Sequence, residues 1–228
     1  MLRADETHAD AGTRGRSAPG AGAVKAATTD DTRDGSRERT ERVFGEGTIG
    51  PVQRMREDLE TIMARDPSIH SAVEALFHST LPAVWLHRAA HRLHRAHHRV
   101  IARALTNLAR VLTGVELHPG ATVGRRFFID HGTGVVIGET AVIGDDVTIY
   151  QQVTLGAVGW WRDVERPPGA RRHPRVGDRC VFGAGAQVLG PVTIGDDVLI
   201  CATSLVVTDV APGDKVVAAP AVRQEDVR

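Results

Sequence analysis

The chain has 228 residues, of which 42% are hydrophobic and 25% charged, and its formal net charge is +0. A chain of this size can bury one good core with a smaller element beside it. The balanced charge gives no basis for electrostatic capture of nucleic acid or of an anionic membrane. The sequence has no apolar run of membrane-spanning length, and its N-terminus lacks the apolar centre of a signal peptide.

Residues 1–47 are rich in Ala, Gly, Thr, Arg and Asp and hold almost no large apolar side chain. Such a segment cannot bury enough surface to offset its ordering entropy, so we predict a disordered tail. Whether this tail has a regulatory role stays open.

Residues 48–113 are predicted to form a helical domain. Apolar side chains recur at helical spacing over 51–65, then from Leu81 or Pro82 to about His98, and again over 100–112, where Gly114 ends the pattern. Between the first two, Asp66 is placed to cap a further helix that begins at Pro67.

The third predicted helix is dense in histidine. Four of its histidines share one face, at a spacing that a divalent metal could use: His87, His91, His94 and His98. That face has no cysteine or carboxylate partner, and arginines are interleaved along the helix. We therefore expect a solvated or subunit-facing surface and no metal site.

Apolar residues, nearly all aliphatic, then recur at six-residue spacing through residues 114–210, with two interruptions. These repeat anchors are Leu117, Val123, Ile129, Ile137, Ile143, Ile149, Leu155, Val176, Phe182, Val188, Ile194, Ile200 and Val206. The residue after an anchor is often Gly, and a small or β-branched residue usually follows four places after it. A six-residue period is the signature of a hexapeptide β-helix, in which three short strands make one triangular coil.

Both cysteines, Cys180 and Cys201, fall within this repeat. We expect small buried residues there and not a disulfide or metal pair, which fits a reduced, cytoplasmic setting.

Three features interrupt the repeat. The anchor spacing lengthens between Ile129 and Ile137, a loop over 157–174 is extruded between coils, and Glu116 precedes the first full hexad. Stacking of coils should bring Glu116 near His131. A carboxylate beside an imidazole can orient a general base, although a surface histidine with incidental acidic neighbours has the same pattern.

The sequence resembles the serine O-acetyltransferases of the hexapeptide acyltransferase superfamily, from about residue 55 to residue 220. Its most specific motifs are Asp130-His131-Gly132-Thr133-Gly134 and Gly138-Glu139-Thr140-Ala141. Further matching segments are Asp66-Pro67, 87–91, 114–121, 152–156, Arg172-His173-Pro174 and 183–186. The resemblance implies an α+β fold, with an N-terminal helical domain before a left-handed parallel β-helix and a C-terminal tail at 211–228.

The resemblance implies transfer of acetyl from acetyl-CoA to the hydroxyl of L-serine, without a metal, as a step in cysteine biosynthesis. It makes His131 the general base and Glu116 the carboxylate that orients it. It assigns Asp66 and Asp130 to the substrate amino group, and Arg172 and His173 to the substrate carboxylate. Contacts with CoA are implied at four small residues, Gly156, Ala157, Ala184 and Ala202. Members of the family form homotrimers with sites between the prisms, and their helices pair trimers into hexamers.

Each of these assignments has a structural alternative. Asp66 could serve only as a helix cap, Arg172 could pair with Asp163 or Glu165, and Gly156 and Ala184 could be turn residues of the repeat.

This sequence departs from the family pattern at three places, one of which is Ala218-Ala219-Pro220-Ala221, where the family usually has Gly-x-Pro-Ala. The loop after Gly156 is longer than usual and carries Trp160 and Trp161, which leaves open another hydroxy-amino-acid or amino-sugar acceptor. Family members bind cysteine synthase through a C-terminal tail ending in Ile. Because this sequence ends at Arg228, we do not expect that complex.

Two other classes of protein are also compatible with the sequence. A metal-dependent hydratase of the γ-carbonic-anhydrase type shares the prism, but it needs several histidines as zinc ligands on adjacent coils, and this region offers only His118, His131 and His173. A non-catalytic scaffold is the other.

Overall fold

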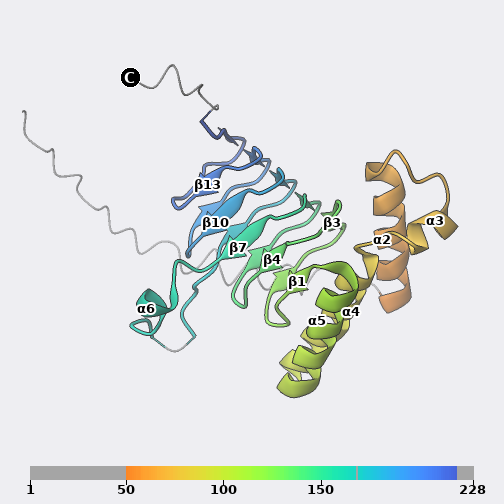
Figure 1. The fold of residues 1–228 in the computed structure, drawn as a ribbon, viewed down its shortest axis with the longest axis horizontal. Helices are drawn as coiled ribbons and strands as arrows, with labels where there is room; N and C mark the ends of the chain where they lie inside the picture. The colour runs from red at the N-terminus through yellow and green to blue at the C-terminus, as the bar shows by residue number, and fades with distance from the viewer. Residues whose placement is uncertain (1–49, 168, 220–228) are drawn as a thin grey trace, which may run out of the picture.

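The computed structural model describes residues 50–167 and 169–219 (Figure 1). Four helices come first: α2 (Pro51–Arg65), α3 (Ala72–Leu76), α4 (Leu81–Arg95) and α5 (Arg99–Thr113). A parallel β-helix follows, with one short helix, α6 (Trp160–Asp163), in a loop that projects from its side (Figure 1). The tail predicted over residues 1–47 and the C-terminal end from residue 220 lie outside the described residues.

The strands of the β-helix form three parallel sheets, which we call faces A, B and C. Face A contains β1 (Glu116–Leu117), β4 (Val136–Ile137), β7 (Thr154–Gly156), β10 (Gln187–Leu189) and β13 (Leu205–Val206). Face B contains β2 (Thr122–Val123), β5 (Val142–Ile143), β8 (Arg175–Val176) and β11 (Thr193–Ile194). Face C contains β3 (Phe128–Ile129), β6 (Thr148–Ile149), β9 (Val181–Phe182), β12 (Leu199–Ile200) and β14 (Lys215–Val216).

The predicted repeat anchors fill the interior of the prism. Ile143, Ile149, Leu155, Val176 and Phe182 are fully buried, and most of the other anchors are nearly so. Burial of aliphatic surface on every coil is the main favourable term in the folding of this unit. The hexapeptide reading of the sequence is therefore confirmed. Cys180 points into the same interior, where burial raises the pKa of its thiol to about 11, and both cysteines are free thiols.

Strand register locates the first interruption of the repeat. Glu116 pairs with Val136, a step of 20 residues, whereas Val136 pairs with Thr154, a step of 18 residues. The extra pair of residues lies in the turn that connects face C to face A, which we call the C–A corner. The second interruption lies between β7 and β8, at the turn from face A to face B, the A–B corner, where residues 157–174 leave the coil.

The helices cover the first coil. In α4, the ring of His87 donates to the carbonyl oxygen of His118 at 3.2 Å, and Nδ1 of His91 donates to that of Pro119 at 2.9 Å. These bonds satisfy carbonyl groups at the end of the prism, where no preceding coil pairs with them. The expectation of a solvated histidine face is thus wrong for His87, which is 3% exposed, and His98 lies beyond the end of α4.

The helix boundaries agree with the sequence reading at α2 and α5, but not between them. No helix begins at Pro67, because the carboxylate of Asp66 accepts from the backbone and the hydroxyl of Ser68 and closes a local turn. Ser71 caps α3 instead, accepting from the backbone of Glu74. α4 also ends earlier than predicted, at Arg95, shortly before His97 turns into the left-handed region with φ of 64°. In the part of the chain that the structure describes, no helix is long and apolar enough to span a bilayer.

Candidate functional site

The lengthened C–A corner presents His131 at the surface of the prism. The backbone of His131 is left-handed, with φ of 60°, a conformation that costs free energy for a residue with a side chain. Its imidazole is 71% exposed, and Nε2 lies 3.7 Å from Oδ1 of Asp130. Left-handed residues also stand at regular corners of the prism, at Gln152 and Thr203 for example, and at this corner the exposed side chain is an imidazole.

Asp66 reaches the same corner from the α2–α3 connection. Its hydrogen bonds from Ser68 lower the pKa of its carboxyl group, and the nearby rings of His78 and His131 lower that pKa further. Asp66 is therefore ionised at neutral pH. The structure thus brings together Asp66, Asp130 and His131, three of the residues singled out in the sequence.

Glu116 lies at the start of face A, on β1. Its carboxylate is ion-paired with Arg110 of α5 at 3.0 Å. The pairing of Glu116 with His131 stays a prediction.

The A–B corner carries a second group of predicted residues, and Thr140 organises it. The hydroxyl oxygen of Thr140 accepts from the backbone N–H groups of Arg172 at 2.9 Å and His173 at 3.1 Å. The backbone N–H of Thr140 donates to Nδ1 of His173 at 3.1 Å. Since Nδ1 accepts, the ring proton of neutral His173 resides on Nε2. Burial lowers the pKa of His173, so this neutral donor form prevails at pH 7.

Arg172 lies beside His173 at this corner. Its guanidinium contacts Oε2 of Glu139 at 2.5 Å and Oδ2 of Asp163, from the extruded loop, at 3.7 Å. A cavity of about 420 Å³ opens here, and it is lined by Arg172, Glu139 and Thr140 together with His94 and Arg99 from the helices. The loop carboxylate that could pair with Arg172 is therefore present, but Glu139 is the closer partner.

The residues predicted to contact CoA are divided between the two corners. Gly156 and Ala157 lie at the end of β7, on the A–B corner. Ala184 and Ala202 lie on the C–A corner, stacked on successive coils above His131, and Ala202 is exposed. Both groups flank face A, one along each edge.

Three residues at these corners were missed by the sequence reading. His78 lies with Asp66 and Asp130, Thr140 holds His173, and Glu139 holds Arg172. Glu139 and Thr140 belong to a motif of the family, but the sequence alone indicates no role for either side chain. Nothing in the sequence pattern marked His78, because its neighbours come from a connection between helices and from a distant turn.

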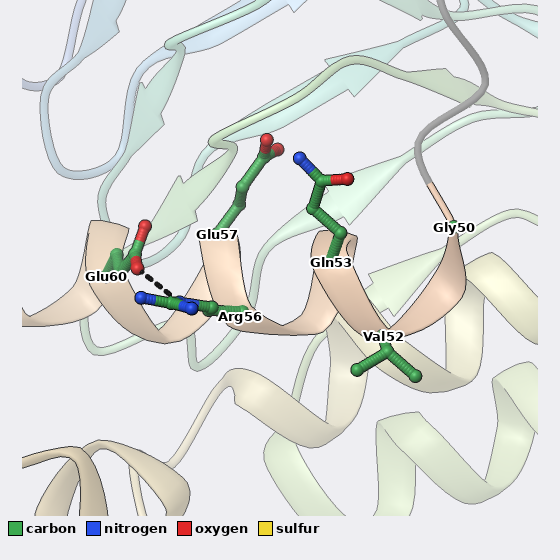
Figure 2. A pocket seen from close by; sticks show the side chains of 6 residues that line it. All are labelled: Gly50, Val52, Gln53, Arg56, Glu57 and Glu60. Carbon is green, nitrogen blue, oxygen red and sulfur yellow. Dashed lines mark hydrogen bonds and ion pairs between the residues drawn. The ribbon is translucent and has the colours of Figure 1, made fainter.

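A separate hollow of about 680 Å³ lies along the first turns of α2 (Figure 2). It contains none of the predicted site residues, and Arg56 and Glu60 at its edge form an exposed ion pair. Among residues 50–167 and 169–219, no group of three or more His, Cys, Asp or Glu side chains is placed to hold a metal ion.

The fold is thus a prism of hexapeptide repeats with imidazole and guanidinium groups along two of its corners. Residues 173–207 match the family model described as bacterial transferase hexapeptide (six repeats). Two relatives named serine acetyltransferase extend the match. The one from Mycobacterium tuberculosis is 51% identical over 167 residues, 73% of this chain and 70% of the relative. The one from Staphylococcus aureus strain Mu50 is 45% identical over 180 residues, 78% of this chain and 81% of the relative.

The chain belongs to the serine acetyltransferase family. Solved structures agree with this assignment. Isoform 3 from Entamoeba histolytica, in complex with cysteine, is 36% identical with a TM-score of 0.69, over 75% of this chain and 59% of that chain. The enzyme from Neisseria gonorrhoeae in complex with serine is 35% identical with a TM-score of 0.66, over 82% of this chain and 73% of that chain. The present chain thus spans less than two thirds of the Entamoeba structure.

Proposed function

We propose that this acyltransferase moves the acetyl group of acetyl-CoA to the hydroxyl group of L-serine, which gives O-acetylserine for cysteine biosynthesis. His131 would take the proton of the serine hydroxyl, and the oxygen would attack the thioester carbonyl directly. A C–O bond forms, the C–S bond breaks, and the proton passes from His131 to the leaving thiol. The exposure of His131 and its position beside Asp130 support this role. Glu116 is proposed to orient His131 in the assembled enzyme.

The two ends of the amino acid would bind to different groups. Asp66 and Asp130, both beside His131, suit the ammonium group. Arg172 and the Nε2–H group of His173 suit the carboxylate, since a planar guanidinium matches a carboxylate in geometry. Glu139 and Asp163 would then hold the guanidinium in place until the substrate arrives.

One observation carries the proposal: within one chain the two halves of this site lie on different corners, with the strands of face A between them. A single prism therefore cannot bind both the ammonium and the carboxylate group of one serine molecule. We propose a homotrimer of left-handed prisms in which the C–A corner of one chain meets the A–B corner of the next. The same cleft would receive acetyl-CoA as co-substrate, because both pairs of small residues, Gly156 with Ala157 and Ala184 with Ala202, border it.

Helices would then join two trimers into a hexamer. On α5 the apolar side chains of Ile101, Leu108 and Leu112 are 48–62% exposed, and Val100 and Val111 are each 83% exposed. Exposed apolar surface of this extent favours burial against another chain. In this proposal the helical domain covers residues 48–113, the acyltransferase domain 114–210 and the C-terminal tail 211–228. The two free cysteines support a cytoplasmic location.

The test is thiol release from acetyl-CoA by the purified full-length chain. Serine, threonine, homoserine and no acceptor are compared for the wild type and for His131→Ala. We expect serine-dependent release that falls by about 10²–10⁴ in the variant, the usual range for a lost general base.

Release with threonine or homoserine in place of serine would shift the acceptor to another hydroxy amino acid, which the extruded loop with Asp163 would then select. Equal activity of His131→Ala and wild type would overturn the role of the base.

A further inference from the structure

His78 lies at the C–A corner, but it has no role in the acetyl transfer proposed for this site. It follows α3, in the connection to α4, and its ring packs against Phe128 with centroids 5.7 Å apart. Its Nε2 atom lies 3.7 Å from Oδ2 of Asp66. Its charge state also responds to Asp130 and His131, so these four residues form one electrostatic cluster.

The hydrogen bonds of Thr80 determine which ring nitrogen of His78 carries the proton. The Thr80 hydroxyl donates its single hydrogen to the carbonyl oxygen of Ile129, at 2.7 Å. Its oxygen lies 3.0 Å from Nδ1 of His78 and must therefore accept there. Nδ1 carries the proton, and Nε2 of the neutral ring is an acceptor.

This tautomer leaves two acceptors facing each other. Nε2 of His78 and the carboxylate of Asp66 are 3.7 Å apart, with no proton to share between them. Burial of the ring lowers the pKa of His78, which keeps it neutral at pH 7. A donor placed between these atoms would satisfy both, and an ammonium group has three N–H donors with a charge that suits Asp66 and Asp130.

We propose that Nε2 of His78 accepts a hydrogen bond from the α-ammonium group of the acceptor substrate and forms, with Asp66 and Asp130, a three-acceptor pocket. This inference rests on the proposed function. It makes His78 a determinant of specificity for a primary α-amine, because a secondary amine has one N–H too few for the three acceptors.

The test uses two matched variants of the full-length enzyme. Asparagine can place an amide N–H near the position of Nδ1, so His78→Asn keeps the bond to Thr80 and removes the distal acceptor. Glutamine can place an amide oxygen near the position of Nε2, so His78→Gln keeps the acceptor and loses the bond to Thr80. A merely structural role therefore predicts that His78→Gln is the more damaged variant, whereas our proposal predicts the opposite.

We expect His78→Asn to raise the KM for serine about tenfold, as for loss of one hydrogen bond to a charged group, while the KM for acetyl-CoA and the Tm stay near those of the wild type. His78→Gln should stay within about threefold of the wild-type KM for serine. An unchanged KM in His78→Asn, or greater damage in His78→Gln, would overturn the proposal.

A measurement on the wild type does not depend on the folding of either variant. N-methyl-L-serine should be used with a kcat/KM at least about tenfold below that of serine, and equal use would overturn the three-acceptor pocket. The proposed function fails separately, because it requires serine-dependent thiol release by the wild type itself. If that release is present and His78→Asn is unaffected, only the role of His78 fails.

Discussion

At the scale of single residues, Thr140 holds together the half of the site proposed for the carboxylate. Its hydroxyl accepts from two backbone N–H groups and lies 2.8 Å from Nδ1 of His173, to which it can donate. Thr140→Val keeps the shape of the side chain but removes these bonds and leaves two N–H groups unpaired. We expect kcat/KM for serine to fall at least about tenfold, since each unpaired buried group costs about 1–3 kcal/mol.

Thr140→Ser is the matched control, because it keeps the hydroxyl and loses one methyl group. Its kcat/KM should stay within about threefold of the wild type. The kinetics of thiol release at varied serine concentration measure both variants. If the serine variant were as damaged as the valine variant, the role assigned to the hydroxyl would be wrong.

The planar guanidinium of Arg172 can be tested with a substitution that keeps the positive charge. Lysine keeps the positive charge but loses the planar fork, so Arg172→Lys cannot hold Glu139 and a substrate carboxylate in the same geometry. We expect the KM for serine to rise about tenfold with little change in the KM for acetyl-CoA. Asp163→Asn is the control variant. It weakens a longer contact, at 3.7 Å, to a guanidinium that is about one third exposed. The KM for serine should therefore change less than about twofold.

The sequence indicated which segments form the candidate site, but not the contacts within it. His131 was predictable because the interrupted repeat and the motif around it coincide. Thr140 and Glu139 were inside a recognised motif, yet their partners arrive from a loop about thirty residues later, and no local pattern reveals such contacts. His78 depends on a hydrogen-bond chain through Thr80 to Ile129, which appears only once the helices are packed on the coil.

At the scale of elements, α4 closes the first coil through buried histidines, and this makes stability depend on pH. Burial lowers the pKa of His87 to about 3, against 6.5 for an exposed histidine. Between these values the unfolded chain binds a proton that the folded chain does not, so stability falls as the pH drops from 6.5 towards 3. His118 changes in the same direction, with burial lowering its pKa to about 4.

We expect His87 to account for a loss of about 1.6 kcal/mol in the free energy of unfolding between pH 6.5 and pH 5. Urea unfolding at these pH values measures it. His87→Gln keeps a donor for the carbonyl of His118 and removes the titration, so its loss over the same interval should be smaller by that amount. Other buried groups, such as His118 and Asp58, whose carboxyl pKa burial raises, titrate alike in both proteins, so the difference between the two proteins isolates His87. If the free energy of unfolding fell equally with pH in both proteins, the pH dependence could not come from His87.

The same elements show why helix boundaries were only partly predictable. Apolar periodicity, with Pro51 at the start of α2 and Gly114 at the end of α5, marked those two helices by strong local signals. Between them, Asp66 followed by Pro67 satisfies the pattern of a helix cap equally well. The turn at Ser68 formed instead, which leaves the second oxygen of Asp66 directed towards His78. The Asp66-Pro67 pair is therefore an ambiguous signal in the sequence. The contact with His78 that accompanies the turn involves a residue beyond α3, so no local pattern reveals it.

At the scale of the whole molecule, the proposed site exists only if copies of the chain associate. The C–A corner holds the proposed base, His131, with the carboxylates of Asp66 and Asp130; the A–B corner holds the guanidinium of Arg172, and face A lies between them. Subunit mixing tests this directly. His131→Ala and Arg172→Ala each disable one half of a site, and both variants should be nearly inactive alone. When they are unfolded and refolded together, some clefts receive two intact halves and activity should return to a fraction of the wild type.

The exposed apolar side chains of α5 determine the expected size of the assembly. One chain has a mass of 24.5 kDa, and we expect light scattering to give six times this mass for the wild type. The double variant Leu108→Glu, Leu112→Glu places charges on the helix face proposed to join trimers, where burial of unpaired carboxylates is costly. It should give three times the mass of one chain and keep its serine-dependent activity, because the proposed clefts lie between the prisms of one trimer. A monomeric wild type that is fully active would show that one prism suffices, and the division of the site between two corners would then have to be wrong.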